Sequence, residues 1–489
     1  MRGPVRRDLI VLAGACVLLR LPALLASRWY DPDEAAIAMQ ARTLVAGGEL
    51  YTDMADRKPP VPPIAYSWFF DLTDSSDPRL ARLLVSLLLA GAAIALYLDV
   101  RRSAGTTVAR WAGGLFVLGA FAFPPTDGGA ANYAHFALPV ATLALLACRR
   151  TRVGRGMWWA LAGGALLGFA MLNRQSWVFA VPAGALSCWL GARWRALPLF
   201  GIGVAAAVST AALMAPWDEY WFWNFKSSPG FVFAATDLGE AAGRAVATAA
   251  LFVVLHLALV VGAGSTLPVS LRRQPDLWAW VVMGLAATSA GLRFYGHYWM
   301  QLLPGLVLLA APAIATASQR WRRIAAGTLA AAAVFAFAGL VTPDTFRERH
   351  DPDDVAAEVQ ACTAPGDRVF VWGSFPELSI AVERPAAGEL VHSDFVTGRS
   401  GGRQASTDAV TPGAEDKMMD DLDADPPVVL IDTSGVPDLL YEAFPMLDNE
   451  RLADFVTGHE YRSTTTPEGF ELWWRADSPC APGASADGQ

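Results

Sequence analysis

The side chains best suited to chemistry lie in one segment near the amino terminus, residues 28–78. It contains the acid pair Asp33-Glu34 and then the basic pair Arg57-Lys58, which is followed directly by two prolines. Lysine is scarce, with 3 lysines against 35 arginines in the whole chain. A carboxylate can act as a general base, and a cation beside a rigid proline-rich backbone can bind a phosphate. This combination suits a reaction that needs a base and a phosphate binder.

Local structure offers a simpler explanation of the same acids. Asp31 is suited to an N-cap, Pro32 to the first helical position and Glu34 to a capping box. The helix that they would begin has one apolar face and ends at Gly47-Gly48. We expect it to lie flat at the membrane surface. The chemical interpretation therefore requires that Asp33 and Lys58 share a cavity with basic residues far away in sequence.

The first two thirds of the chain is apolar enough to be embedded in lipid. Apolar residues make up 54% of the protein and charged residues 17%, against about 25% charged in soluble proteins. A membrane-spanning helix needs about 20 mostly apolar residues. The sequence predicts a polytopic α-helical membrane protein with about eleven such spans, at residues 8–27, 79–98, 107–123, 133–148, 157–172, 176–191, 197–216, 244–263, 277–292, 298–316 and 322–341.

Charge divides the chain into two predicted domains. Residues 1–341 carry a net charge of +11, and residues 342–489 carry −19. Sixteen arginines fall in alternate loops, starting with the amino terminus, and such loops are usually cytoplasmic. With eleven spans, residues 28–78 and the carboxyl-terminal domain would then lie outside a cytoplasmic membrane.

The domain at residues 342–489 has the pattern of a soluble α/β fold. Strands are predicted at 368–372, 428–431 and 470–474, and helices near 351–362, 417–422 and 448–456. Cys362 and Cys480 lie near its two ends. An oxidising compartment would allow them to pair, but the sequence leaves the pairing open.

Several motifs together resemble the GT-C superfamily of membrane glycosyltransferases. They are Asp33-Glu34, Lys58-Pro59-Pro60, Leu172-Asn173-Arg174-Gln175, and the stretch from Arg293 to Pro304 that contains Tyr295, His297 and Tyr298. The closest likeness is to the branch of protein O-mannosyltransferases and lipid A aminoarabinose transferases. It covers roughly residues 8–310.

The resemblance implies an enzyme that moves a sugar from a polyprenyl-phosphate donor to an acceptor hydroxyl, with inversion, on the outer face of the membrane. Asp33 would be the general base, and Glu34 would orient it or bind sugar hydroxyls. Lys58, with Arg57, Arg174 or Arg293, would bind the donor phosphate. The expected partners are the lipid bilayer, the lipid-linked donor and an acceptor glycan, glycolipid or protein, with no nucleic acid. Neither the sugar nor the acceptor can be identified.

The sequence also departs from the family pattern. Members often carry a second acid at the outer start of the fourth span, where this chain offers only Asp127, Asn132 or His135. Tyr295, His297 and Tyr298 are candidates for substrate binding, with interfacial packing as the alternative. No ligand spacing requires a metal, although the outer acids are compatible with a divalent cation. The alternative functions are a transporter or flippase of lipid-linked sugars, and a membrane sensor or assembly protein with an exported binding domain.

Overall fold

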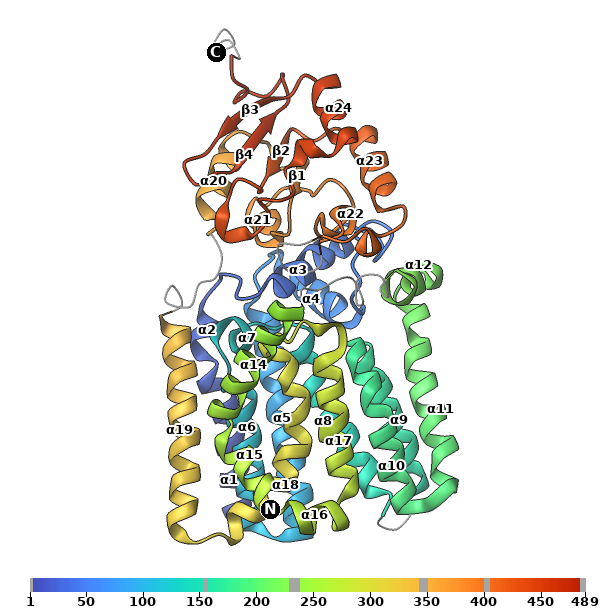
Figure 1. Cartoon of the computed structure of the whole chain (residues 1–489), viewed down its shortest axis with the longest axis vertical. Helices are drawn as coiled ribbons and strands as arrows, with labels where there is room; N and C mark the ends of the chain where they lie inside the picture. Colours follow the sequence, from blue (N-terminus) through green and yellow to red (C-terminus); the bar gives the residue numbers. More distant parts are fainter. Residues whose placement is uncertain (1–2, 153–155, 228–237, 343–350, 400–404, 484–489) are drawn as a thin grey trace.

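The chain forms a helical bundle with an α/β region stacked on one end (Figure 1). The computed structural model describes residues 3–152, 156–227, 238–342, 351–399 and 405–483. The first helix begins at the end of the bundle away from the α/β region. Two of the sixteen arginines used to predict the orientation, Arg2 and Arg155, lie outside the described residues.

Each of the eleven predicted spans coincides with one or two helices of the bundle. These helices are α1 (Gly3–Leu19), α2 (Leu21–Leu25), α5 (Arg79–Ala104), α6 (Thr106–Phe121), α8 (Tyr133–Arg150), α9 (Met157–Met171), α10 (Val181–Ala192), α11 (Ala196–Ser209), α14 (Leu238–Leu255), α15 (Leu257–Ser265), α17 (Pro275–Ser289), α18 (Leu303–Thr316) and α19 (Gln319–Val341). Among the described residues, five helical stretches are long and apolar enough to cross a membrane: 79–104, 175–213, 238–255, 296–316 and 319–341. The remaining spans are shorter or interrupted, so the count of eleven stays a prediction.

Glycine allows some of these helices to approach closely. A Cβ added to Gly164 of α9 would lie 2.1 Å from the carbonyl oxygen of Phe200 in α11. A Cβ on Gly203 of α11 would lie 2.3 Å from the carbonyl oxygen of Leu161. Small residues at helix contacts are typical of membrane bundles, because lipid supplies no hydrophobic force between helices and close packing must hold them together.

Short helices form a layer between the bundle and the α/β region. They are α3 (Pro32–Val45), α4 (Val61–Thr73), α7 (Pro125–Gly129) and α12 (Trp217–Trp221). Helix α3 does not lie open on the membrane surface as expected. Residues 34–41 are all buried, because α4 packs on one side of α3 and α21 (Pro376–Ala381) of the α/β region packs on another. Small alanine side chains along α3 allow this enclosure on several sides.

The α/β region contains a four-stranded sheet in the order β1-β2-β4-β3. Its strands are β1 (Val369–Trp372), β2 (Val429–Asp432), β3 (Arg462–Thr465) and β4 (Glu471–Trp474). Strands β1 and β2 are parallel, while β4 runs antiparallel to both of its neighbours. The helices of this region are α20 (Asp353–Ala361), α21, α22 (Asp394–Thr397), α23 (Ala414–Ala424) and α24 (Glu450–Gly458). The three predicted strands and three predicted helices are present, and β3 is additional.

A disulfide closes the α/β region. Cys362 follows α20 and pairs with Cys480, with their Cα atoms 5.9 Å apart across a sequence separation of 118 residues. The sequence had left this pairing open.

Residues 49–58, which we call the bridge loop, join the α/β region to the bundle. The Ala55 amide donates to the carbonyl of Glu389 at 2.8 Å, and the Val391 amide donates to the carbonyl of Ala55 at 3.2 Å. Lys417 of α23 forms an ion pair with Glu389 at 2.6 Å and donates to the carbonyl of Thr52. The bridge loop is therefore anchored to the α/β region by both main-chain and side-chain contacts.

Candidate functional site

A cavity of about 950 Å³ lies between the bundle and the α/β region. Its walls come from the start of α3, the bridge loop, the segment before α7, helix α14, residues 293–299 and several loops of the α/β region. Phe123, Leu251, Phe252 and Leu255 contribute apolar surface to its lining. Charged side chains of both signs also line it. This volume is within the range of small-molecule binding sites.

Asp33 and Lys58 meet in this cavity. The Lys58 ammonium donates to Asp33 Oδ1 at 2.5 Å and lies 5.0 Å from the centre of the Tyr133 ring. The side chains retain 34% and 27% of their exposure, for Lys58 and Asp33 respectively. Asp33 lies in the first turn of α3, and Lys58 lies just before the proline-rich start of α4. Both groups are held by short, rigid backbone segments while remaining open to a ligand.

The charges around this pair keep both members ionised. Burial alone would raise the pKa of Asp33, but Lys58 and His297 outweigh it and hold the pKa below its ordinary value. Burial alone would lower the pKa of Lys58, but Asp33 and the nearby Asp56 raise it instead. Asp33 is thus a carboxylate and Lys58 an ammonium at neutral pH, which is the state that a base and a phosphate binder need.

His297 approaches the same acids from residues 293–299. Its main-chain amide and Nδ1 both contact Asp127 Oδ1, at 2.9 and 2.8 Å. Its Nε2 lies 4.0 Å from Asp33 Oδ2, and its Nδ1 lies 4.0 Å from Asp31 Oδ2. Only 6% of His297 is exposed, and Nε2 has no hydrogen-bond partner among the described residues. The contact of Nδ1 with Asp127 orients the ring so that Nε2 faces Asp33.

Asp31, Asp33 and His297 form a cluster that could hold a metal ion. One ligand atom from each lies within 4.8 Å of the others. Asp31 caps α3 by accepting from the Asp33 amide at 2.9 Å, and its other oxygen accepts from Asn132 at 2.7 Å. Burial and the neighbouring Asp33 carboxylate raise the pKa of Asp31 to about 7. Crowded carboxylates beside an unpartnered imidazole nitrogen suit a divalent cation, which would relieve their repulsion.

Glu34 is turned away from the cavity. Its side chain is fully buried and bound by both arms of Arg82, with Nε–Oε1 at 2.9 Å and Nη2–Oε2 at 2.7 Å. It also accepts from the amides of Ala131 at 2.8 Å and Tyr30 at 3.2 Å. Every lone-pair direction of the carboxylate is occupied by protein. The expectation that Glu34 binds sugar therefore does not fit its position, and its contacts are those of a structural brace.

The three arginines expected at the phosphate lie in different places. Arg57 turns into the α/β region, where it bonds Thr411 and the carbonyl of Ala409 and packs 4.4 Å from the Phe395 ring centre. Arg174 lies behind Tyr298, with its guanidinium 4.1 Å from the ring centre, and its charge helps to lower the pKa of Asp33. Arg57 and Arg293 both line the cavity, whereas Arg174 is not part of its wall. Because the Arg57 guanidinium is already bound to the α/β region, we expect Arg293 rather than Arg57 to meet a ligand together with Lys58.

The remaining expected residues divide between the cavity wall and the interior. Tyr295 and Tyr298 line the cavity, and the Tyr295 ring lies nearly parallel to His297, with 6.1 Å between centres. Asp127 lines it too and orients His297. His135 is completely buried, and its Nδ1 contacts Asn132 at 3.0 Å. Asn132 donates to Asp31 and contacts His135. His135 and Asn132 therefore support the position of Asp31 without lining the cavity.

Sequence reasoning missed several residues of the site. Arg82 lies one turn inside an apolar helix, and a charge at that position is itself a signal for a function or a buried partner. Asp56 lines the cavity two residues before Lys58. The α/β region contributes His392, Asp394 and Arg399, with Arg399 and Asp394 paired at 3.3 Å. No local pattern marks these three, because the fold alone brings them to the cavity.

Comparison with known proteins identifies the fold. No family profile and no curated protein sequence matches the chain. Among solved structures, ArnT from Cupriavidus metallidurans bound to undecaprenyl phosphate matches with a TM-score of 0.57 and 14% identity, over 96% of this chain and 98% of that one. The oligosaccharyltransferase of Archaeoglobus fulgidus, in complex with zinc and sulfate, matches with a TM-score of 0.54 and 13% identity, over 96% and 73%.

The chain has the GT-C fold. The resemblance drawn from the Asp-Glu and Lys-Pro-Pro motifs is thereby confirmed at the level of the GT-C fold. The match to ArnT spans nearly the full length of both chains, so it includes the α/β region that the sequence motifs did not cover. At this level of identity the likeness extends to architecture alone, and the site must be argued from its own residues.

Proposed function

We propose that this GT-C protein transfers a sugar from a polyprenyl-phosphate donor to an acceptor hydroxyl inside the cavity. The observation that carries the proposal is the contact between the Asp33 carboxylate and the Lys58 ammonium in a cavity lined by both apolar and charged residues. A lipid phosphate needs both kinds of surface. Its isoprenoid chain would lie along Leu251, Phe252 and Leu255, and its phosphate would meet Lys58 and Arg293.

Each residue has a definite task in such a transfer. Asp33 takes the proton from the acceptor hydroxyl as the oxygen forms a bond to the anomeric carbon. The bond from that carbon to the phosphate oxygen breaks on the opposite face, and its electron pair leaves with the phosphate. A phosphate monoester with a second pKa of about 6 is a good leaving group without a strong acid. Lys58 and Arg293 stabilise the charge that develops on it, and the anomeric centre inverts.

Lys58 has two competing partners in this scheme. Without a ligand the Lys58 ammonium is bound to Asp33, and this contact occupies the carboxylate that would act as the base. A donor phosphate competes for the same ammonium and releases the carboxylate for the acceptor proton. Donor binding would therefore activate the base, and this order prevents Asp33 from acting before a donor is present.

The residues of the acid cluster also fit a divalent cation. Asp31, Asp33 and His297 would hold it, because Nε2 of His297 lacks a partner among the described residues and faces Asp33 across 4.0 Å. A bound cation would offset negative charge on the donor phosphate. The Archaeoglobus fulgidus structure was solved with zinc and sulfate, which is compatible with such a site.

The orientation follows from the same proposal. The disulfide Cys362–Cys480 favours an oxidising compartment for the α/β region. The arginine-rich loops lie at the other end of the predicted spans, which favours a cytoplasmic location for them. We therefore place the cavity and the region from residue 342 onward on the outer face. Nucleotide sugars are cytosolic, so a lipid-linked donor suits this location.

Transfer from a panel of radiolabelled polyprenyl-phosphate sugars by purified protein tests the proposal. Wild type should transfer at least one sugar, and Asp33→Asn should reduce turnover by about 10²–10⁴-fold because the base is lost. Asp71→Asn, which changes an exposed acid on α4, is the matched control and should behave as wild type. Equal turnover by Asp33→Asn and wild type would remove Asp33 from catalysis, and no transfer with any donor would favour a transporter.

A further inference from the structure

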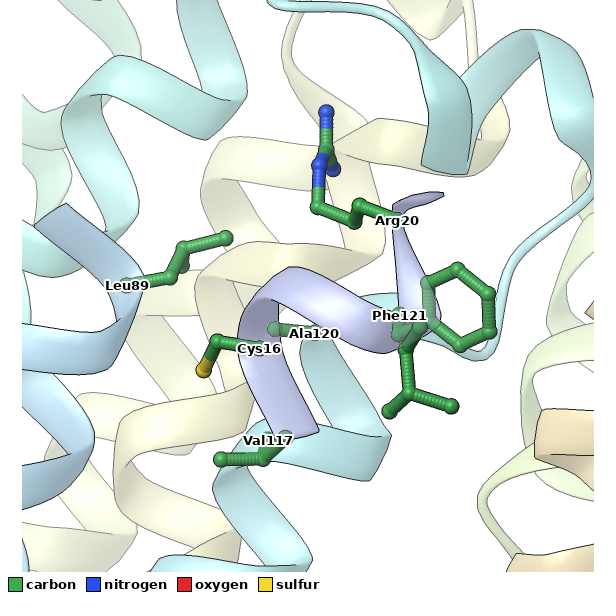
Figure 2. A pocket seen from close by; sticks show the side chains of 7 residues that line it. Cys16, Arg20, Leu89, Val117, Ala120 and Phe121 are labelled. Atoms are coloured by element: carbon green, nitrogen blue, oxygen red, sulfur yellow. The ribbon is translucent and has the colours of Figure 1, made fainter. Parts of the chain in front are cut away.

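Arg20 is a buried arginine at the junction of α1 and α2, and the reaction proposed above does not use it. Only 2% of the residue is exposed. Figure 2 shows its guanidinium pointing away from Cys16, while its aliphatic stem lies beside a small apolar space. That space measures about 10 Å³, and about 10–15 Å³ is needed for a single water. Arg20 therefore does not bind a ligand there, and its burial needs another explanation.

The guanidinium binds three consecutive carbonyl groups at the end of α7. Nη1 donates to Gly128 at 2.6 Å, and Nη2 donates to Gly129 at 3.0 Å and Ala130 at 2.9 Å. The last carbonyls of a helix have no partner within it and carry partial negative charge. A planar cation with several donors satisfies them together, which an ammonium could not do as well.

Helix α7 has little freedom to shift once it is held in this way. A Cβ on Gly129 would lie 2.7 Å from Leu340, and one on Gly128 would lie 3.2 Å from the carbonyl of Phe121. Asp127 is the residue immediately before these glycines. Its carboxylate packs so closely on Gly296 that a Cβ there would lie 2.1 Å from Oδ2. The position of Asp127 is thus restricted in two ways. Arg20 holds the carbonyl groups that follow it, and Gly296 packs against its carboxylate.

Asp127 in turn fixes His297 through two contacts to one oxygen, from the main-chain amide and from Nδ1. These contacts set the ring orientation and direct Nε2 toward Asp33. We infer that Arg20 is a positioning residue: it holds α7 so that Asp127 orients His297 against Asp33. The inference rests on the proposed function, since it assigns Arg20 to the same site. It also explains why a charge is retained inside the first predicted span, where it is costly.

The test compares Arg20→Gln and Arg20→Lys with wild type in the donor panel. Loss of the three carbonyl contacts should reduce kcat by up to about 10²-fold, since a displacement of about 1 Å can have that effect, while the donor KM changes little. Arg20→Lys should fall between, because it keeps the charge and part of the bonding. Arg149→Gln is the control, a half-buried arginine that binds Asp276 at 2.6 Å near the opposite end of the bundle, where Arg152 also binds Asp276.

A second measurement does not depend on turnover. Diethyl pyrocarbonate modifies accessible imidazole nitrogens, and mass spectrometry locates the product. In Arg20→Gln, His297 should be modified several-fold faster than in wild type. His392, which also lines the cavity but belongs to the α/β region, should react at the same rate in both.

The outcomes are distinct. Wild-type kcat and wild-type His297 labelling in Arg20→Gln would overturn the inference and leave Arg20 as a helix-end contact. If Arg20→Gln does not fold, Arg20→Lys decides by the same two readouts. If wild type itself transfers no sugar, the proposed function fails, while the labelling still tests the link from Arg20 to His297.

Discussion

The adjacent acids Asp33 and Glu34 should respond differently when each is replaced by its amide. Glu34→Gln should lower the stability of the protein, whereas Asp33→Asn should lower turnover. Glu34 is fully buried, and it is the anion bound by the equally buried Arg82. Replacing it with glutamine leaves the Arg82 charge without a counterion and turns an NH₂ group toward at least one existing donor. Breaking a buried pair from one side costs about 3–5 kcal/mol of stability. Glu34→Gln should therefore lower the stability of the protein by that amount.

Asp33→Asn should have little effect on stability. Asp33 and Lys58 retain about a quarter to a third of their side-chain exposure, and an ion pair open to water contributes about 1 kcal/mol or less. Asp56 also lies close enough to attract the Lys58 charge. The loss should appear in turnover, by about 10²–10⁴-fold. We therefore predict that Asp33 affects mainly turnover and that Glu34 affects mainly stability.

The assay follows thermal unfolding by tryptophan fluorescence in detergent, alongside donor turnover at a temperature where all variants are folded. Asp71→Asn again serves as the exposed control. The reasoning is refuted if Glu34→Gln unfolds at the wild-type temperature yet loses turnover, because Glu34 would then belong to the chemistry. It is refuted equally if Asp33→Asn lowers the unfolding temperature as much as Glu34→Gln does.

Three further predictions concern the phosphate, the metal and the disulfide. Lys58→Gln should reduce turnover by about 10²–10³-fold through loss of charge stabilisation, with partial recovery in Lys58→Arg; unchanged turnover in a filter assay would contradict this role. His297→Ala should weaken Mn²⁺ binding, measured by calorimetry after EDTA treatment, by about 10–100-fold, and equal binding would exclude the cluster as a cation site. Cys362→Ser should lower the stability of the α/β region by about 2–5 kcal/mol, seen as earlier proteolysis of that region, and an unchanged cleavage rate would show that the disulfide adds no stability.

Much of the fold could be predicted because membrane helices and buried strands leave strong patterns in sequence. Apolar runs predicted most of the bundle, since lipid requires them, although the short helix at Leu267–Arg273 lies outside the predicted spans. Strand β3 was missed because it is an edge strand with mostly exposed polar residues, Arg462–Thr465. The enclosure of α3 was missed because its covering helix α21 comes more than 300 residues later, and no local signal reports that contact.

The site was predictable only where local motifs fix it. Asp33 and Lys58 belong to short rigid segments whose sequence already suggested a base and a cation. Glu34 could not be assigned, because its role depends on Arg82, which lies 48 positions away. Arg57 precedes Lys58 directly but binds the α/β region, and the contacts that decide this come from residues 352 and 354 positions later.

The bridge loop has a consequence for how the protein is made. Its hydrogen-bonding partners at Glu389 and Val391, like the Ile380 carbonyl that Arg42 reaches across 338 positions, are synthesised long after it. During synthesis the loop lacks these hydrogen bonds until most of the remaining chain has been made. Lys58 is the last residue of this loop, so a chain that ended before residue 380 would contain the helices of the predicted spans and still lack these contacts near Lys58. The proposed activity would then require the α/β region to be synthesised first.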